Sequence, residues 1–277
     1  MFREEIRSKR IVVKVGSKVL VDKSGTPNVQ RMKKIVKDIS SINKQDNEIA
    51  LVTSGAIGSG IEALKFKTRP TDITDLQMAA AVGQLRLISI YDELFKNYKC
   101  QIAQILLTHD VLKNKHQCTN AQNTISNLLS NKIIPIINEN DTVSTDEIKF
   151  GDNDVLAGLV AKLINADALI LLSTIDGLRT SVQNGRTKRI SYVNQINKTI
   201  FSHVDDQKDN LSLGGMKSKL ESAKLAGDEG IPVIIADGRK DNVVSKIISG
   251  EDEGTFFNAE IRNHEVEIIG EQLRSAM

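Results

Sequence analysis

The sequence predicts an α/β protein in which helices form two layers around a mainly parallel β-sheet, a three-layer αβα sandwich. Short runs rich in Val, Ile and Leu alternate along the chain with longer stretches whose apolar residues recur at helical spacing. The short runs are apolar at nearly every position, as expected of strands that are covered on both faces. The loops that follow them are rich in Gly and small polar residues.

The first elements show this alternation clearly. Residues 11–15 (IVVKV) form a β-branched run that predicts a buried strand, and residues 48–52 (EIALV) predict a second one. Between them, residues 28–45 carry apolar side chains at a spacing that places them on one face of a helix. These side chains are Val29, Met32, Ile35, Val36, Ile39 and Ile42.

The same alternation continues through most of the chain. Four more strands are predicted at 101–107, 132–138, 167–172 and 232–237, and four more helices at 74–97, 117–130, 153–164 and 216–228.

The sequence indicates one large domain. The polar stretches 179–189 and 204–213 each fit a hairpin or a mobile loop, and neither is a convincing linker. We expect a single α/β domain over residues 1–257 and a tail over 258–277 that forms no separate domain.

Composition excludes several classes of protein. The 277 residues are 40% hydrophobic with a formal net charge of +2, which is typical of a globular chain. No apolar run approaches the roughly 20 residues of a membrane span, and the charged N-terminus predicts no secretory signal, so we expect a cytoplasmic protein. The two cysteines and four histidines show no metal-binding or disulfide spacing, and few aromatic residues and no basic block argue against nucleic-acid binding.

Candidate functional residues fall in the loops after the strands, where α/β sheets bind ligands. Lys14 and Gly16 close the first strand, and residues 53–60 (TSGAIGSG) open a helix after the second. Glycine permits close backbone approach, and free N–H groups at a helix start favour an anion. Taken alone, the segment at Lys14 and Gly16 also fits a tight turn. Residues 53–60 also fit a close packing contact between a helix and the sheet.

Polar residues are denser after the fourth strand. Residues 138–141 (NEND) and 151–154 (GDND) form two clusters of acids and amides, which suit an ammonium or amide ligand or the orientation of lysines. Helix capping by Asn153 or Asp154 is the alternative, and it explains only one residue of the second cluster. Residues 173–178 fit a simple turn, and residues 214–219 (GGMKSK) form a further Gly-rich helix start that suits phosphate.

These segments together, in this order, resemble the glutamate 5-kinase branch of the amino acid kinase family. The matching segments are Lys14-Val15-Gly16-Ser17, Val52-Thr53-Ser54-Gly55-Ala56-Ile57, Ala79-Ala80-Ala81-Val82-Gly83-Gln84, Asn138-Glu139-Asn140-Asp141, Gly151-Asp152-Asn153-Asp154 and Gly214-Gly215-Met216-x-Ser218-Lys219. The similarity runs from about Lys9 to about Phe257. Each motif alone is weak, and the ordered set is specific.

The resemblance implies a reaction and roles for individual residues. ATP, carried with Mg²⁺, would phosphorylate the γ-carboxylate of L-glutamate to L-glutamyl 5-phosphate, the first step of proline biosynthesis. Lys14 and Lys219 correspond to phosphate-stabilising lysines, and Asp152 to the carboxylate that organises them. Glutamate contacts are implied at Ser54, Gly55, Asp141 and Asn153 in the N-terminal lobe. ATP contacts are implied at Lys14, Gly16, Ser173, Thr174, Gly214, Gly215, Met216, Lys217, Ser218 and Lys219, mainly in the C-terminal lobe.

The resemblance also implies a homo-oligomer, dimer or tetramer, and feedback inhibition by proline. The twenty residues after Phe257 are too few for the PUA domain that many relatives carry, so a short form is expected. Two positions depart from the family pattern: Thr174, where Asp is common, and Leu213, where Thr is common. They leave open a catalytically impaired ligand sensor, and a kinase for another small acid is the other alternative.

Overall fold

Eight strands form one sheet in the computed structural model, which describes residues 9–22, 26–144, 153–180, 187–205 and 215–259. The strands are β1 (Arg10–Val15), β2 (Glu48–Val52), β3 (Ile102–Leu107), β4 (Ile134–Glu139), β5 (Ala168–Ser173), β6 (Tyr192–Val193), β7 (Val233–Asp237) and β8 (Thr255–Phe257). Their order across the sheet is β3–β4–β2–β1–β5–β7–β8–β6.

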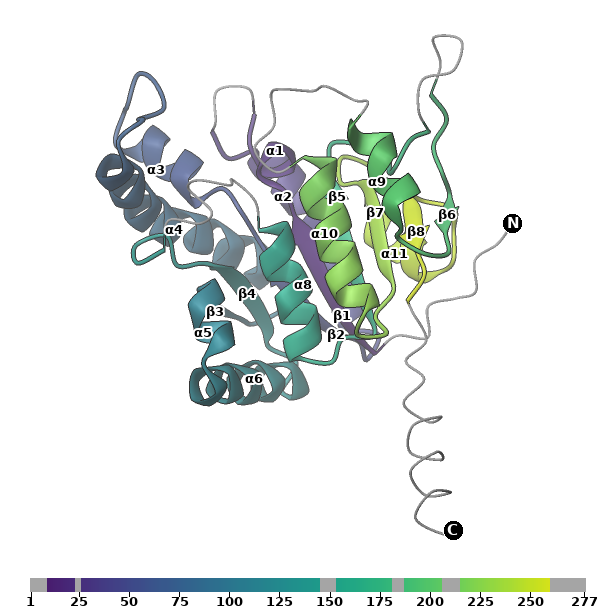
Figure 1. The fold of residues 1–277 in the computed structure, drawn as a ribbon. Coiled ribbons are helices and arrows are strands. Elements are labelled where there is room, and N and C mark those ends of the chain that lie inside the picture. Colours follow the sequence, from purple (N-terminus) through teal and green to yellow (C-terminus); the bar gives the residue numbers. More distant parts are fainter. Residues whose placement is uncertain (1–8, 23–25, 145–152, 181–186, 206–214, 260–277) are drawn as a thin grey trace.

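The sheet is mainly parallel, as predicted. Every neighbouring pair from β3 to β7 is parallel, whereas β8 runs antiparallel to β7 and parallel to β6. Strand β1 lies inside the sheet, where Lys14 is level with Val52 of β2 on one side and with Leu171 of β5 on the other. The first strand of the chain therefore joins the two halves of the sheet (Figure 1).

The helices begin where the sequence offers caps. Asp72 accepts hydrogen bonds from the N–H groups of Thr74 and Asp75, and Asn28 accepts one from Arg31. The helices are α1 (Ser17–Leu20), α2 (Val29–Asn43), α3 (Ala56–Ala63), α4 (Ile73–Lys96), α5 (His109–Lys113), α6 (Lys115–Ser130), α8 (Asp154–Leu163), α9 (Lys198–Asp205), α10 (Met216–Gly227) and α11 (Val243–Ile248).

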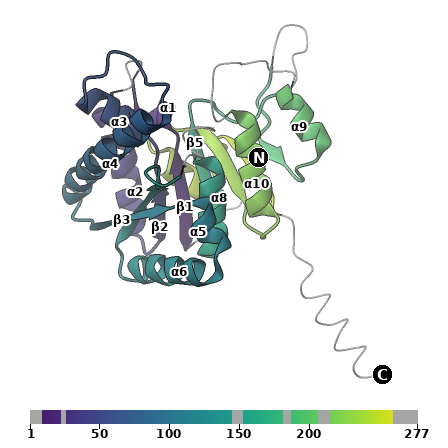
Figure 2. The same ribbon diagram turned by 60° about the vertical axis from the view of Figure 1, so that its left-hand side comes forward.

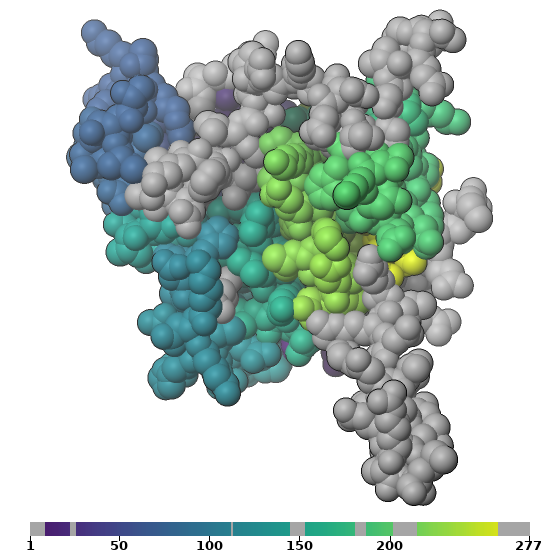
Figure 3. Space-filling view, in the orientation of Figure 1, coloured from purple at the N-terminus to yellow at the C-terminus, as the bar shows by residue number. Residues whose placement is uncertain are grey.

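Two apolar clusters, one on each face of the sheet, establish the three layers. Ile11 and Val13 of β1 point to the face covered by α1, α2, α4 and α11, and Val12 points to the face covered by α6, α8 and α10. Helices α8 and α10 lie side by side in front of the sheet in Figure 1, and Figure 3 shows their side chains covering it. Figure 2 shows the sheet between the two layers, so the αβα prediction is confirmed.

Helices α3 and α4 approach each other unusually closely. A Cβ atom at Gly60 would lie 1.7 Å from the carbonyl oxygen of Ala79, and one at Gly83 would lie 1.8 Å from that of Ala56. Only glycine fits at these two contacts, because both neighbours are backbone atoms of a packed helix. This contact fixes α4 against the loop that follows β2.

The structure adds detail that periodicity does not predict. All six predicted strands are present, but β3 is an edge strand and is only partly buried. Helix α3 begins where the glycine-rich segment 53–60 predicted a helix, whereas strands β6 and β8 and the short helices α1, α5, α9 and α11 were not predicted. The hairpin interpretation of 179–189 is supported by an antiparallel bridge between Arg179 and Arg189, while most of 204–213 lies outside the described residues. In the described part of the chain no helix has the length and apolarity to cross a membrane.

Candidate active site

The carboxyl ends of β1, β2, β4 and β5 lie together at the point where the chain stops adding strands on one side of β1 and begins adding them on the other. The chain places β2, β3 and β4 on one side of β1 and then crosses to β5 on the other side. In open α/β sheets a crevice forms beyond the strands at such a switch point, and ligands bind there. The predicted site residues Lys14, Ser54, Asn153 and Ser173 all lie at or next to these strand ends.

Two buried lysines share one carboxylate at this point. The ammonium group of Lys14 lies 2.5 Å from Oδ1 of Asp154, and that of Lys219 lies 2.7 Å from Oδ2. Lys14 comes from β1 and Lys219 from the first turn of α10, whereas Asp154 begins α8. Their exposed fractions are 2%, 6% and 0%. Three elements distant in sequence therefore meet in one buried ionic cluster.

Asp154 is firmly held. The hydroxyl of Ser218 donates to its Oδ2 at 3.1 Å, and the hydroxyl of Ser222 donates to its main-chain oxygen at 2.7 Å. Buried charges persist when they are paired and hydrogen-bonded, as here. The cluster keeps two cations together at the strand ends, which suits a group with several negative charges.

The predicted organising carboxylate, Asp152, lies outside the described residues, and its role stays a prediction. Asp154 belongs to the cluster 151–154 that was predicted to suit an ammonium or amide ligand or to orient lysines, with helix capping as the alternative, but no role of its own was predicted for it. It lies on the buried face of α8 with Ala157 and Ala161, and that i, i+3, i+7 spacing was the signal that could have identified it.

Amide side chains connect the ends of β2, β4 and α8 beside the lysine cluster. Nδ2 of Asn153 donates to the main-chain oxygen of Thr53 and to Oδ1 of Asn138, both at 2.6 Å. Asn153 makes no capping hydrogen bond to α8, so the capping alternative is wrong for this residue. Ser54 is buried next to Thr53, and Gly55 begins α3 with a φ of 103°, a left-handed conformation that favours glycine.

Asp141 lies just beyond β4 and is 4% exposed. Burial, with a further contribution from the negative charge of Glu139, raises the pKa of Asp141 to about 7, although Arg69 opposes the shift. Among the described residues nothing hydrogen-bonds its Oδ1. A ligand that brings positive charge would stabilise the ionised form of this carboxyl group.

The predicted ATP-binding residues lie on the other side of the lysine cluster. Gly16 follows β1, and a Cβ atom there would lie 3.8 Å from the ammonium nitrogen of Lys14. Ser173 ends β5 and Thr174 follows it, one strand from β1. Gly215 begins α10 without a side-chain cap, so the first N–H groups of this helix point toward the same edge.

The remaining predicted ATP contacts differ in their positions. Ser218 contacts Asp154 directly, Met216 is partly buried against the core, and Lys217 is exposed. Gly214 lies outside the described residues.

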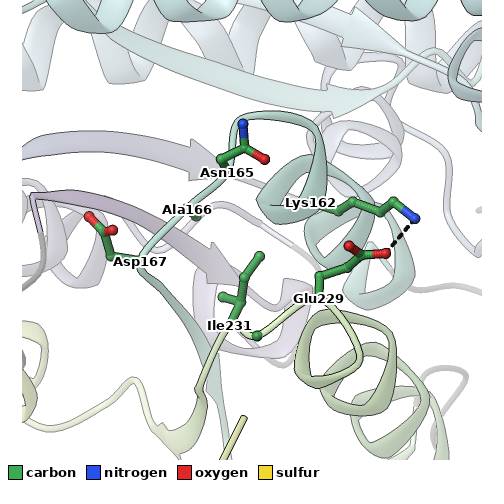
Figure 4. A pocket seen from close by; sticks show the side chains of 7 residues that line it. Lys162, Asn165, Ala166, Asp167, Glu229 and Ile231 are labelled. Carbon is green, nitrogen blue, oxygen red and sulfur yellow. Dashed lines mark ion pairs between the residues drawn. The ribbon is translucent and has the colours of Figure 1, made fainter. Parts of the chain in front are cut away.

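One cavity of the described surface lies at the opposite end of the sheet. It has a volume of about 250 Å³ and lies where β5 and β7 begin, beside the last turn of α8. Lys162 and Glu229 form an ion pair of 2.6 Å at its rim, and Asp167 lies across from them (Figure 4). This cavity is therefore separate from the lysine cluster.

Comparisons with known proteins agree with the fold. The sequence profile described as the amino acid kinase family matches residues 9–237. The chain is 44% identical over 250 residues to the glutamate 5-kinase of Clostridium acetobutylicum, covering 90% of this chain and 94% of that one. It is 39% identical to the glutamate 5-kinase of Enterococcus faecalis, covering 91% and 95%, and 42% identical to that of Thermoanaerobacter sp., covering 90% and 67%.

Among solved structures, UMP kinase from Bacillus anthracis matches with a TM-score of 0.61 at 19% identity, covering 91% of this chain and 97% of that one. That likeness supports the fold alone. The family profile covers most of the chain, and the relatives match along nearly its whole length. The chain belongs to the amino acid kinase family.

Proposed function

We propose that this protein is a glutamate 5-kinase, which transfers the γ-phosphoryl group of ATP to the γ-carboxylate of L-glutamate and thereby begins proline biosynthesis. The observation that carries the proposal is the cluster of Lys14 and Lys219 on Asp154 at the switch point of the sheet. Relatives of 39–44% identity that bear the name glutamate 5-kinase support the choice of acceptor.

The chemistry requires no general base. The γ-carboxylate of glutamate has an ordinary pKa of about 4.3, so it is already ionised at neutral pH. The difficulty is to bring this anion against the anionic triphosphate. Lys14 and Lys219 would stabilise the charge on the transferring phosphoryl group, and Asp154 would hold both of them in place.

Mg²⁺ would arrive with the nucleotide, because this ion is usually held by substrate phosphates together with one or two carboxylates. When bound, Mg²⁺ would neutralise phosphate charge.

Glutamate would occupy the side formed by Ser54, Gly55, Asp141 and Asn153. Asp141 would pair with the substrate ammonium, because a nearby positive charge favours the ionised form of a buried carboxyl. The ammonium requirement favours glutamate over N-acetylglutamate, which lacks that charge.

ATP would occupy the side formed by Gly16, Ser173, Thr174 and the start of α10, residues 214–219. The first N–H groups of α10, which no described side chain caps, suit phosphate oxygens. Apart from Lys14 and Gly16, the proposed ATP contacts follow the proposed glutamate contacts along the chain, so glutamate would occupy the N-terminal lobe and ATP the C-terminal lobe.

A homo-oligomer and inhibition by proline remain part of the proposal. Their support is the family resemblance, and each needs its own measurement: the mass of the particle in solution, and the rate at increasing proline concentration.

The proposal is tested by ADP release with Mg·ATP and L-glutamate, N-acetylglutamate or aspartate, with hydroxylamine present to trap an acyl phosphate. Hydroxamate formed with glutamate alone is the expected result. Preferred use of N-acetylglutamate would indicate another acid kinase of the family. ATP binding without turnover of any acceptor would support a ligand sensor instead.

A further inference from the structure

A row of side-chain amides continues from the strand ends into helix α4. Nδ2 of Asn138, whose Oδ1 accepts from Asn153, donates to Oε1 of Gln84 at 2.7 Å. Gln84 lies in the middle of α4, on the segment AAAVGQ that the sequence analysis singled out without assigning it a role. The row therefore runs from the main chain of Thr53 through two asparagines to Gln84.

The main-chain oxygen at one end of this row determines which group donates and which accepts in every hydrogen bond along it. The main-chain oxygen of Thr53 can only accept, so Asn153 must present its NH₂ group. That NH₂ group also faces Asn138, which must therefore present its oxygen. Asn138 then directs its NH₂ group at α4, and the side chain that receives it must offer an acceptor. Gln84 does so with Oε1.

Helix α4 is a rigid support for that acceptor. Gly83, the residue before Gln84, lies against the backbone of α3 so closely that no Cβ atom would fit. Two turns further along α4, the buried hydroxyl of Tyr91 lies 2.9 Å from that of Thr53. The helix thus contacts the row at both of its ends, at Gln84 and at Thr53.

We propose that Gln84 is a positioning residue for the acceptor substrate. Through Asn138 it fixes the carboxamide of Asn153, a predicted glutamate contact, and so keeps the acceptor side of the site in its binding geometry. This inference rests on the proposed function, because it assigns the amide row to the side of the site that takes glutamate. Gln84 itself acts through Asn138 and is not a catalytic residue.

The test compares Gln84→Leu with a matched variant, Gln77→Leu. Gln77 lies two turns earlier on α4, and no hydrogen bond or ion pair of its side chain is found among the described residues. Both variants replace glutamine by leucine, which has a similar helix propensity. Losing the acceptor leaves a buried donor of Asn138 unpaired, which predicts about a tenfold higher glutamate KM for Gln84→Leu. The ATP KM should stay close to that of Gln77→Leu, and Tm should fall by only a few degrees, the cost of the unpaired donor.

The conservative variant Gln84→Glu should restore most of the glutamate affinity, because a carboxylate still accepts the hydrogen bond from Asn138. If Gln84→Leu does not fold, Gln84→Glu is compared with Gln84→Lys, whose side chain offers only donors. The lysine variant should then show the higher glutamate KM.

Three results would overturn the inference: an unchanged glutamate KM in Gln84→Leu, an equal rise in both KM values with a lowered Tm, or equal glutamate KM values for the Glu and Lys variants. Failure of the proposed function looks different, because wild type would then form no hydroxamate with glutamate. If another acceptor is used, the same KM comparison decides the inference with that acceptor. A wild-type enzyme inactive with every acceptor overturns both proposals.

Discussion

Replacing Asp154 by asparagine removes the negative charge that Lys14 and Lys219 share and leaves the shape of the side chain unchanged. Both ammonium groups are nearly completely buried, at 2.5 and 2.7 Å from the two carboxylate oxygens. Removing one partner of a buried ion pair typically costs about 3–5 kcal/mol, because the remaining charge stays buried. For a chain of this size, that loss corresponds to a fall in Tm of about 10 °C.

The same substitution should affect catalysis more than binding of glutamate. Asp154 keeps the two cations in the position where we expect the phosphoryl group, and loss of one preorganised donor lowers kcat by about 100- to 1000-fold in well-studied enzymes. We therefore expect kcat of Asp154→Asn to fall by about that factor. The glutamate KM should change little, because the predicted glutamate contacts do not include the lysines.

The assay is hydroxamate formation at saturating Mg·ATP, together with thermal unfolding. Asp38→Asn is a suitable control, because Asp38 is also a buried carboxylate but accepts hydrogen bonds from the N–H groups of Val244 and Ser245 at the start of α11. This control should lose stability and keep its kcat. Asp154→Glu, which keeps the charge but is longer, covers the case in which Asp154→Asn does not fold. A kcat within threefold of wild type in both Asp154 variants would refute the role of this carboxylate.

Four further predictions concern Lys219, Asp141 and Gly83. Lys219→Ala should lower kcat by about 100-fold with little change in the glutamate KM, while Lys162→Ala, at the opposite end of the sheet, should leave steady-state kinetics unchanged. Since the pKa of Asp141 is raised to about 7, the glutamate KM should fall as pH rises through 7, and Asp141→Asn should show a higher KM without that dependence. The raised pKa also means that the ligand-free protein loses stability as pH rises from about 4 to about 7, because the folded state holds the proton of Asp141 more tightly than the unfolded state. Asp141→Asn should abolish this contribution to the pH dependence of Tm. Gly83→Ala places a Cβ atom against the main-chain oxygen of Ala56 and should lower Tm by more than about 5 °C, whereas unaltered unfolding would contradict the close α3–α4 contact.

The elements that the sequence predicted well are those whose pattern is repeated over many residues. Helices α2 and α4 and the buried strands β1, β2 and β5 have long or uniformly apolar patterns, and the structure has them within one or two residues of the predicted bounds. Strand β3 has the same apolar pattern but lies at the edge of the sheet, which its sequence does not reveal.

Short elements were missed because their stability comes from tertiary contacts. Helix α11 has only six residues, and Asp38 of α2 accepts hydrogen bonds from the N–H groups of Val244 and Ser245 in its first turn. The two-residue strand β6 exists only through its pairing with β8.

The candidate site was predicted in outline but not in its connections. Strand ends and Gly-rich helix starts indicated where Lys14 and Lys219 would lie, because parallel strands end at the same edge. Sequence order does not show which carboxylate reaches both lysines, and the structure places Asp154 there. The link from Asn138 to Gln84 spans 54 positions, so no local pattern could have predicted it.

The central claim is that the γ-carboxylate of glutamate attacks the γ-phosphorus of ATP beside Lys14 and Lys219. The most direct measurement uses L-glutamate labelled with ¹⁸O in its γ-carboxylate and analyses the phosphate released when hydroxylamine cleaves the product. Hydroxylamine attacks the carbonyl carbon, so the bridging oxygen leaves with the phosphate. The account predicts one ¹⁸O atom per phosphate, formed in step with hydroxamate. Unlabelled phosphate would contradict it, since water and not glutamate would then be the acceptor.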